Sequence, residues 1–418
     1  MTENSLNEDN RILVVEPMSS GHALLAAARQ LGIETVVASY NRDDRQLSPA
    51  LREQIDTLIV LDTNDEAALT QAALELHEQK RFSGIMPGFE FYVDSVARLA
   101  ALLEIPGLPV EATEALRNKA SMRDKARSAG LRVPRYTEIT STNGLDAAAE
   151  QVGYPCVLKP TRSAGSVHVS RVDTPDELRR AYEWMLADTR TDLGRGLDGR
   201  ALLEEYVDGP EVSVEGYVAD GQVVIASITG KLLGPEPNFV EVGHIVQMEL
   251  SPDVRGAVET FVHDVCRELR VTLGPFHCEL RIPTGEPVLI EIGARLAGDH
   301  ICDLIEIVTG ISLPKVMLAA YAGLDLHQVA APVAPRTKCA GIHFFTAHEL
   351  PVFTDAHGLN ELRRSSDTLE VELYLEPGEA IPPPEDFRCR IGHVVYTADS
   401  YSEALERWHD IREEVRLD

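Results

Sequence analysis

Two lysines stand in sequence contexts that could serve a phosphate-binding site. Lys159 ends the apolar run 156–159, directly before the small-residue turn 163–166. Burying an ammonium group without an anionic partner is costly, so this position predicts a phosphate clamp made of one positive charge and backbone N–H groups. The alternative is a strand-end lysine beside a hairpin. Lys119, in a polar helix start, does not by itself differ from a solvated surface lysine.

An extended segment, residues 202–207, precedes an Asp-Gly-Pro turn, and Glu211 begins the next strand. Backbone N–H and C=O groups of such a segment can bind the edge of a purine. A carboxylate directly after the turn can hold ribose hydroxyls. The turn sequence alone does not specify a nucleotide, because Asp-Gly-Pro is a common turn.

A pair of carboxylates flanks a second turn. Glu279 and Glu291 lie in two apolar strands that a Pro-Thr-Gly-Glu connection joins. Strands joined this way can place the two side chains face to face, where they repel each other unless a cation lies between them. Oxygen ligands of this kind suit Mg²⁺. The more apolar strand predicts that Glu291 is the more buried of the two, and the alternative for each is an exposed strand end.

Arg295 follows Glu291 by four residues. A guanidinium at this position can hold a carboxylate or a transferring phosphoryl group through two parallel hydrogen bonds. The alternative is an ion pair with Asp299, four residues further on, at a helix entry.

The elements that would position these residues alternate at first between strands and helices. Short apolar runs predict parallel strands, and the segments between them predict helices, which together indicate a doubly wound sheet; the strands are expected at 12–15, 34–39, 58–61 and 84–87, with helices at 23–31 and 89–103. The turn 19–22 lacks the GxGxxG pattern and is interpreted as a tight strand-to-helix turn, with anion binding as the alternative.

The rest of the chain predicts a mixture of helices and antiparallel strands. Helices are expected at 110–130, 175–187, 252–269, 313–322 and 402–417. Strands are expected at 156–159, 167–172, 201–205, 211–218, 222–229, 274–282, 287–292, 340–346, 369–374 and 390–396. Those at 201–229 are expected to form one antiparallel sheet. Residues 191–200 are Gly-rich and predict a mobile connection, and 332–335 resembles a linker.

Composition excludes several classes of protein. Asp and Glu number 67 against 39 Lys and Arg, a net charge of -28 that disfavours nonspecific nucleic-acid binding. No apolar run is long enough to span a membrane. The first ten residues are polar and acidic, unlike a signal peptide, and are expected to be frayed. Six scattered cysteines without a CxxC pair favour reduced thiols and a cytoplasmic protein.

In this order and at these separations, the motifs resemble those of the ATP-grasp carboxylate–amine ligases, over essentially the whole chain. The resemblance implies an α/β and α+β protein with the ATP-grasp fold: an N-terminal doubly wound parallel sheet, two α+β lobes that clamp ATP, and a C-terminal β-rich subdomain. The implied divisions are residues 1–110, 111–208, 209–325 and 326–418.

The resemblance also implies roles for individual residues. Those that would contact ATP are Lys119, Lys159, Ser163, Gly165 and Ser166 near the phosphates, Glu204, Glu205, Tyr206 and Val207 at adenine, and Glu211 at ribose. Glu279 and Glu291 would hold Mg²⁺, with Mn²⁺ as the alternative ion. Many members carry Asn where this chain has Gly293, so a side-chain oxygen of their metal site is missing.

The stretches 87–90, 231–244 and 291–299 are similar to those of the L-amino-acid (dipeptide) ligases, which include enzymes that make dipeptide-like antibiotics such as dapdiamides. By this similarity the residues near the amino-acid substrates are Glu90, Ser166, Glu241, His244 and Arg295, with Arg295 and Lys159 catalytic. The alternatives are an acid that favours a helix dipole for Glu90 and a satisfied core histidine for His244.

The expected activity is ATP-dependent amide-bond formation between two amino acids or derivatives, through an acyl phosphate, with ADP and phosphate as products. The alternatives are an ATP-grasp ligase with a non-amino-acid acceptor and a nucleotide-binding protein without turnover. The expected partners are ATP and the two small substrates, with no nucleic acid and no membrane. The resemblance leaves open the identity of the substrates, the number of metal ions and whether the chain forms a homodimer.

Overall fold

The computed structural model describes residues 10–347 and 349–418. Most of the N-terminal segment expected to be frayed therefore lies outside the described residues. The first sheet is parallel, in the order β3-β2-β1-β4. Its strands are β1 (Arg11–Val15), β2 (Glu34–Ser39), β3 (Thr57–Val60) and β4 (Gly84–Pro87). Every residue of β1 is buried, as the continuous apolar run predicts for a central parallel strand.

The helices around this sheet come from both ends of the sequence. The local ones are α1 (His22–Leu31), α2 (Pro49–Arg52), α3 (Glu66–Gln79) and α4 (Val93–Leu102). From much later in the chain, α11 (Leu313–Ala322) packs against α1 and β4. The helix expected at 89–103 begins as a 3-10 turn, so that the regular helix starts only at Val93. The parallel sheet thus shares one hydrophobic core with distant segments.

The long helix expected at 110–130 is two helices, α5 (Val110–Arg117) and α6 (Lys119–Ser128). The break lies at Asn118, which has an extended backbone and whose side-chain oxygen accepts hydrogen bonds from the N–H groups of Ala120 and Ser121. An asparagine in this arrangement is a helix N-cap. The cap fixes Lys119 as the first residue of α6.

A second, smaller sheet has the order β5-β8-β6-β7 and is antiparallel. Its strands are β5 (Tyr136–Ile139), β6 (Cys156–Pro160), β7 (Ser170–Val172) and β8 (Ala201–Glu205). Two helices, α7 (Leu145–Val152) and α8 (Pro175–Ala187), pack against it. The strand expected at 167–172 begins only at Ser170. The expectation that β8 shares a sheet with the two strands after it is wrong, because the chain crosses into the third sheet at the Asp-Gly-Pro turn.

The third sheet is antiparallel and has eight strands, in the order β13-β12-β9-β10-β11-β14-β17-β16. They are β9 (Glu211–Ala219), β10 (Gln222–Leu233), β11 (Glu241–Val246), β12 (Gly274–Arg281), β13 (Val288–Gly293), β14 (Cys339–Phe345), β16 (Thr368–Leu373) and β17 (Gly392–Ala398). The C-terminal strands therefore extend the sheet of the preceding lobe. β11 was not expected from the sequence.

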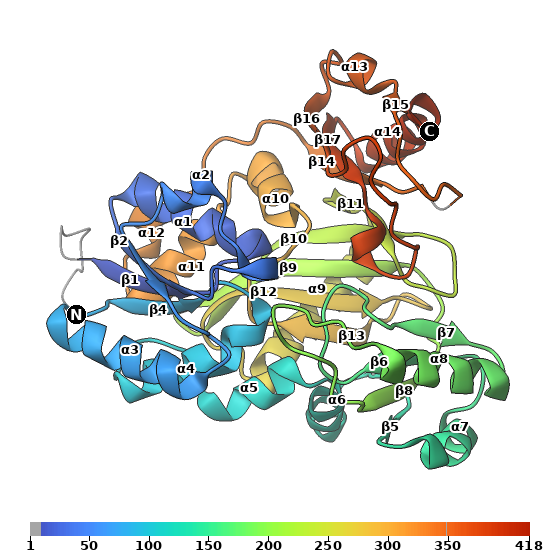
Figure 1. The fold of residues 1–418 in the computed structure, drawn as a ribbon, viewed down its shortest axis with the longest axis horizontal. Helices are drawn as coiled ribbons and strands as arrows, with labels where there is room; N and C mark the ends of the chain where they lie inside the picture. The colour runs from blue at the N-terminus through green and yellow to red at the C-terminus, as the bar shows by residue number, and fades with distance from the viewer. Residues whose placement is uncertain (1–9, 348) are drawn as a thin grey trace.

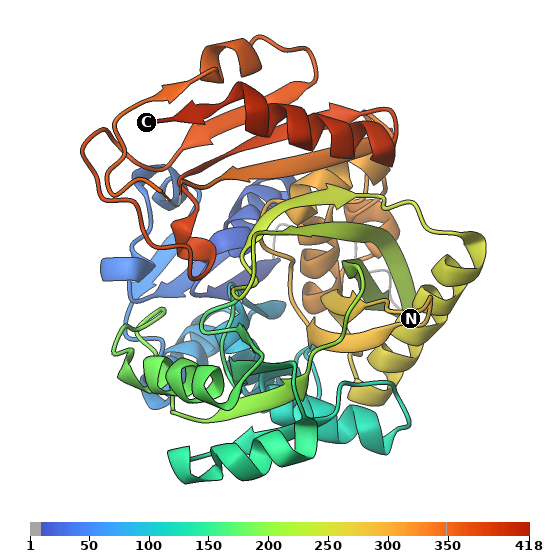
Figure 2. The same cartoon turned by 90° about the vertical axis from the view of Figure 1, so that its right-hand side faces the viewer.

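Helices cover this sheet along its length (Figure 1). They are α9 (Pro252–Leu269), α10 (Ile301–Thr309), α13 (Leu359–Leu362) and α14 (Tyr401–Glu414), whereas the short α12 (Leu326–Val329) packs against α11. A short pair of strands, β15 (Ala356–His357) and β18 (Arg416–Leu417), belongs to the C-terminal part. Figure 2 shows the C-terminal elements on one side of the central strands and the small sheet on the other.

The connection 191–200, expected to be mobile, is docked on the N-terminal domain. Leu193 is buried, and its carbonyl accepts a hydrogen bond from Asn64 Nδ2 at 2.9 Å. Arg195 Nε donates to Asn64 Oδ1 at 2.8 Å. None of the described helices has both the length and the hydropathy needed to cross a membrane.

Candidate functional site

One cavity of about 670 Å³ lies where the three sheets approach one another. Its size is in the range of small-molecule sites. Every residue that the sequence predicts at the site lines this cavity: Glu90, Lys119, Lys159, Ser163, Gly165, Ser166, Glu204, Glu205, Tyr206, Val207, Glu211, Glu241, His244, Glu279, Glu291 and Arg295. The fold thus brings these residues together, and their individual roles remain predictions.

Lys159, at the end of β6, is buried beside a carboxylate. Its Nζ lies 2.5 Å from Glu204 Oε2, and Arg123 Nε lies 2.5 Å from the other oxygen of Glu204. Burial lowers the pKa of Lys159, and the negative charge of Glu204 opposes that shift. Two cations therefore share one anion. Such an excess of positive charge in a cavity wall suits a phosphate ligand.

Lys119 connects the small-residue turn to the acidic pair. Its Nζ donates to the carbonyl of Ser163 at 3.0 Å and to Glu291 Oε1 at 2.8 Å, and its side chain is only 7% exposed. The position results from the Asn118 cap, since α6 begins at Lys119 and directs it toward β13. The two predicted phosphate lysines thus reach the cavity from different elements, Lys119 from α6 and Lys159 from β6.

The turn 163–166 lies against the C-terminal part of the chain. Gly165 has a φ of +64°, and an added Cβ would lie 2.4 Å from a ring carbon of Phe387. The backbone N–H of Phe387 donates to the Gly165 carbonyl at 3.4 Å. Only glycine fits this conformation at this distance. The C-terminal segment therefore forms part of the cavity wall beside the predicted phosphate turn.

Glu279 and Glu291 are directly paired residues in the β12–β13 ladder. Their side chains are 18% and 28% exposed, so the expectation that Glu291 is the more buried is wrong. Glu291 lines the cavity together with its neighbour Ile290, because a register shift between β12 and β13 leaves Ile290 without a partner in the ladder. The two carboxylates have the oxygen donors that Mg²⁺ prefers, and such a site is completed by phosphate and water.

Gly293 provides no ligand, and the space above it is taken. A Cβ added there would lie 3.3 Å from Arg295 Cγ and 3.4 Å from Arg295 Nε. A side chain at position 293 would therefore meet the Arg295 side chain. Without a ligand from residue 293, the oxygen donors available here for Mg²⁺ are the carboxylates of Glu279 and Glu291.

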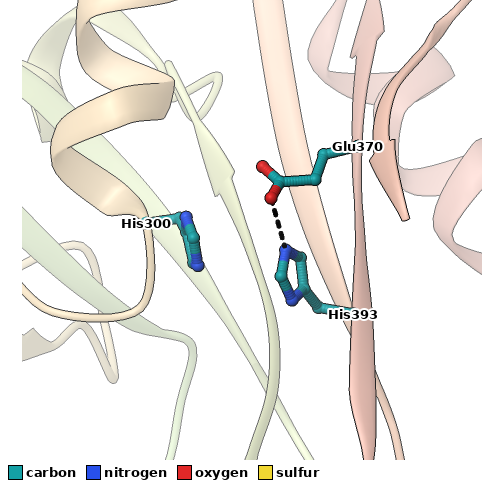
Figure 3. Close-up of side chains that lie close together, drawn as sticks. All are labelled: His300, Glu370 and His393. Atoms are coloured by element: carbon teal, nitrogen blue, oxygen red, sulfur yellow. Dashed lines mark ion pairs between the residues drawn. The ribbon is translucent and has the colours of Figure 1, made fainter. Parts of the chain in front are cut away.

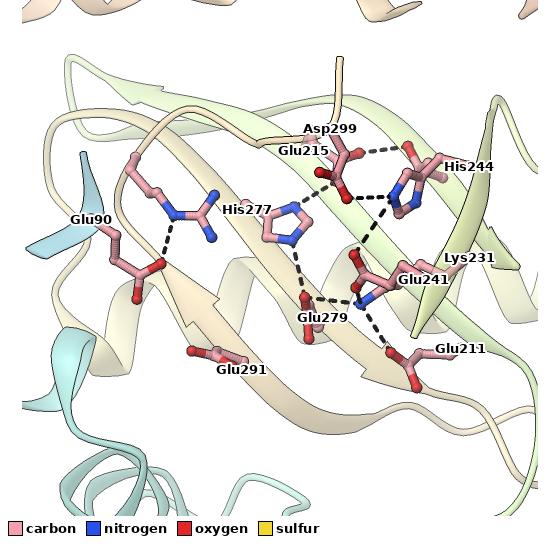
Figure 4. Close-up of polar contacts among 12 residues, drawn as sticks. Glu90, Glu211, Glu215, Lys231, Glu241, His244, His277, Glu279, Glu291 and Asp299 are labelled. Carbon is pink, nitrogen blue, oxygen red and sulfur yellow. Dashed lines mark hydrogen bonds and ion pairs between the residues drawn. The ribbon is translucent and has the colours of Figure 1, made fainter. Parts of the chain in front are cut away.

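Lys231, the first residue of the stretch 231–244, lies at the centre of the acidic residues. Lys231 Nζ is 2.9 Å from Glu211, 2.5 Å from Glu241 and 2.9 Å from Glu279, and the lysine side chain is 2% exposed (Figure 4). Burial lowers the pKa of Lys231, but the three carboxylates outweigh it and raise the pKa well above the usual value. Lys231 therefore carries a positive charge that holds the three acids together.

His277 supplies a second cation next to Glu279. Its Nδ1 lies 2.9 Å from Glu215 Oε1, and its Nε2 lies 3.2 Å from Glu279 Oε1. Burial lowers the pKa of His277, while its hydrogen bonds to the two carboxylates raise it to about 9. Burial likewise raises the pKa of Glu279, but Lys231 and His277 bring it well below the usual value. Glu279 is therefore ionised, as a metal ligand must be.

Arg295 and Glu90 form an ion pair across the cavity. Arg295 Nε donates to Glu90 Oε2 at 2.8 Å, and the other Glu90 oxygen pairs with Arg117. Burial raises the pKa of Glu90, but the charges of Arg295, Arg117 and Lys119 outweigh it and lower the pKa to about 2. The alternative pairing of Arg295 with Asp299 is not what the structure contains. No local sequence pattern indicated that Arg117 belongs to the site, because its role depends on its contact with the distant Glu90.

Asp299 belongs instead to a cluster with His244 and Arg390. Arg390 Nη1 donates to Asp299 Oδ1 at 2.7 Å, and His244 Nε2 lies 3.1 Å from Asp299 Oδ2. Glu241 Oε2 lies 3.7 Å from the same His244 nitrogen. His244 is buried and lines the cavity, but its Nδ1 has no hydrogen-bond partner in the described chain, so the alternative of a satisfied core histidine does not hold.

The extended segment after β8 carries aromatic and basic groups. The guanidinium carbons of Arg171 and Arg281 lie 4.5 Å and 5.4 Å from the Tyr206 ring centroid. Arg281 Nη1 donates to the Val207 carbonyl at 3.0 Å, and Arg281 Nη2 lies 2.8 Å from Glu211 Oε2. Arg281 thus fixes both the predicted adenine segment and the predicted ribose carboxylate.

Comparisons with known proteins agree with this arrangement. Family models match an ATP-grasp N-terminal domain at residues 25–107, an ATP-grasp domain at 152–303 and an L-amino acid ligase C-terminal domain at 343–418. The dapdiamide A synthase of Enterobacter agglomerans is 27% identical over 82% of this chain and 78% of that enzyme.

Two further relatives match most of the chain. The L-arginine-specific L-amino acid ligase of Bacillus subtilis is 21% identical over 82% of both chains. The crystal structure of the L-amino acid ligase from Bacillus licheniformis superposes with a TM-score of 0.84, at 25% identity and over 99% of both chains.

Proposed function

Because this chain is an ATP-grasp carboxylate–amine ligase with the C-terminal domain of the L-amino acid ligases, we propose that it joins two amino acids through an acyl phosphate. The observation that carries the proposal is the convergence of Lys119, Lys159, the Glu279–Glu291 pair and Arg295 on one cavity. These groups supply positive charge for phosphates, oxygen ligands for Mg²⁺ and a guanidinium for a carboxylate.

The proposed reaction has two steps. A carboxylate oxygen of the first amino acid forms a bond to the γ-phosphorus of ATP, and the bond to ADP breaks. The amine of the second amino acid then attacks the acyl carbon, loses a proton, and phosphate leaves. The protein contributes chiefly positioning and charge neutralisation.

Each step assigns tasks to residues of this chain. Lys159 and Lys119 hold the phosphates, while Glu279 and Glu291 hold Mg²⁺, which neutralises phosphate charge when bound; Mn²⁺ offers the same ligand preference. Arg295 bridges the substrate carboxylate and the transferring phosphoryl group, in a position that its pair with Glu90 maintains. A guanidinium that binds the charge developing in the transition state raises the rate of transfer.

An acyl phosphate must be protected from water. The contact between Gly165 and Phe387, which both line the cavity, supports this chemistry because it brings the C-terminal segment to the predicted phosphate turn. The free cysteines are all buried, which fits a reducing compartment, and we assign the protein to the cytoplasm.

A panel of amino-acid pairs tests the proposal. Purified protein with ATP and Mg²⁺ should release ADP and phosphate only with productive pairs, and mass spectrometry should find a product equal to both amino acids minus water. The Glu279→Gln variant serves as the inactive control. Nucleotide binding without turnover on any pair would favour a binding protein, and turnover only with an amine that is not an amino acid would favour the other class of acceptor.

A further inference from the structure

A second group of possible metal ligands lies outside the cavity. It consists of His300, at the start of α10, Glu370 in β16 and His393 in β17 (Figure 3). One ligand atom from each residue lies within 4.8 Å of the others. None of the three lines the cavity described above. The group connects the loop that follows Arg295 to the C-terminal strands.

His393 presents an unsatisfied nitrogen to this group. Its side chain is fully buried, and within the described chain its Nε2 has no hydrogen-bond partner. Glu370 Oε1 lies 3.8 Å from this nitrogen, too far for a hydrogen bond. Buried polar atoms nearly always have a partner, so this nitrogen, which faces the Glu370 carboxylate, is available to a ligand.

Neighbouring side chains orient both imidazoles. His393 Nδ1 lies 2.6 Å from the hydroxyl of Tyr374, and His300 Nδ1 lies 3.2 Å from Asp303 Oδ2. Metal-bound histidines usually donate their other ring N–H to such an oxygen, which fixes the tautomer and leaves Nε2 free to bind the metal. Each histidine thus already has the outer partner that metal coordination requires.

The charge of the surroundings favours a cation. Glu370 and Asp303 are acidic, and Asp299 precedes His300 directly. The nearby Arg390 is already paired with Asp299 and Glu241. The His300 and His393 rings have centroids 4.6 Å apart and planes 33° from parallel. Ring stacking explains the contact between the two histidines, but it does not explain why the Glu370 carboxylate lies beside them.

We propose that His300, Glu370 and His393 bind a transition-metal ion of the Zn²⁺ class. Two imidazoles and one carboxylate, with a position left for water, form a known type of Zn²⁺ site. At metal–ligand distances of about 2.0–2.2 Å, the donor atoms must approach to roughly 3.5 Å of one another. Glu370, whose side chain is 50% exposed, has room for this movement.

The ion would connect Glu370 and His393, on the C-terminal strands, to His300, which directly follows Asp299. Asp299 in turn contacts His244 and Arg390 at the edge of the cavity. The proposed site is independent of the proposed reaction, because none of its ligands is assigned to ATP or to the amino acids. Its function is to hold the C-terminal subdomain against α10.

Zn²⁺ binding by the chelator-treated, full-length protein tests the proposal. Competition against a chromophoric chelator measures affinity and stoichiometry, and Co²⁺ absorption reports the geometry of the ligands. Tyr374→Phe removes only the oxygen that orients His393 and should weaken Zn²⁺ binding by about 10–100-fold. The matched control is Tyr154→Phe, because the hydroxyl of Tyr154 has no hydrogen-bond partner in the described chain.

Ligand variants complete the test. Glu370→Gln and His393→Ala should abolish the Co²⁺ spectrum, whereas His357→Ala, at an exposed histidine, should leave it unchanged. Far-UV circular dichroism checks the fold, and Tyr374→Phe keeps the test decisive should His393→Ala not fold. Binding that is lost in His244→Ala instead would move the ion to the Glu241–His244–Asp299 cluster and overturn the proposal. Affinity unchanged by both Tyr374→Phe and Glu370→Gln would also overturn it.

Discussion

Replacing Lys231 with methionine removes the positive charge that holds three acidic side chains together. Glu211, Glu241 and Glu279 all lie within 2.9 Å of its Nζ, and their side chains are only 10–18% exposed. Methionine keeps much of the side-chain volume, so the principal loss is electrostatic. The expected result is a lower free energy of unfolding, because three partly buried carboxylates then repel one another.

The expected magnitude follows from the contacts that remain. Removing one partner of a buried ion pair costs about 3–5 kcal/mol. Each acid keeps a second cation, namely Arg281 for Glu211, Arg390 for Glu241 and His277 for Glu279. We therefore expect a loss near the lower end of the range, about 3 kcal/mol.

Urea unfolding measures this loss, with Lys80→Met as the matched control. Lys80 pairs with Glu34 at 2.6 Å, but its side chain is 47% exposed, so the same substitution there should cost less than about 1 kcal/mol. Adding Glu241→Gln to Lys231→Met should restore part of the stability, because it removes one repelling charge. A Lys231→Met protein as stable as Lys80→Met would refute the account of Lys231 as the central cation.

Three further substitutions test separate parts of the site. Lys159→Met should abolish turnover while the protein stays folded, because Glu204 keeps its pair with Arg123; unchanged dependence of the rate on ATP would place Lys159 outside the phosphate site. Arg295→Lys should lower kcat strongly and leave nucleotide titration nearly unchanged, because lysine lacks the two-pronged geometry; normal turnover would remove Arg295 from the catalytic residues. Burial and nearby acids raise the pKa of Asp192 to about 6 from an ordinary 3.8. The folded state therefore binds the proton of Asp192 more tightly than the unfolded state does. The stability that this protonated carboxyl group contributes is complete below about pH 4 and is lost as the pH rises to about 6. Asp192→Asn should abolish that fall in urea midpoints measured across this range, whereas Asp220→Asn, on an exposed turn, should keep it; a wild-type pH profile for Asp192→Asn would contradict the assignment.

Sequence patterns predicted most elements that carry the site, because local signals were sufficient there. The continuous apolar runs gave the parallel strands, and the strand pair around Glu279 and Glu291 followed from its short turn. The break at Asn118 was also present in the sequence as a capping residue, but the surrounding helical pattern hid it. β11 was missed because its strand, Glu241–Val246, follows a Gly- and Pro-rich stretch and contains polar residues that face the cavity.

Pairings between distant residues were beyond the reach of local patterns. Nothing in the sequence around Arg117 indicates that it meets Glu90, and nothing around β8 indicates that the chain changes sheet after it. The burial of Glu291 was misjudged for a related reason. A register shift in the β12–β13 ladder leaves Ile290 unpaired, so that Ile290 and Glu291 both line the cavity, and the sequence of the strand does not reveal this irregularity.

The central claim is that a substrate carboxylate is phosphorylated by ATP before the amide bond forms. The most direct measurement uses an amino acid labelled with ¹⁸O in its carboxylate, together with a productive partner, ATP and Mg²⁺. The acyl-phosphate route transfers one labelled oxygen to inorganic phosphate, because the bond between the acyl carbon and that oxygen breaks when the amine attacks. Label in the phosphate, with ADP as the nucleotide product, is the predicted result. Label in AMP, or unlabelled phosphate alongside the amide product, would contradict it.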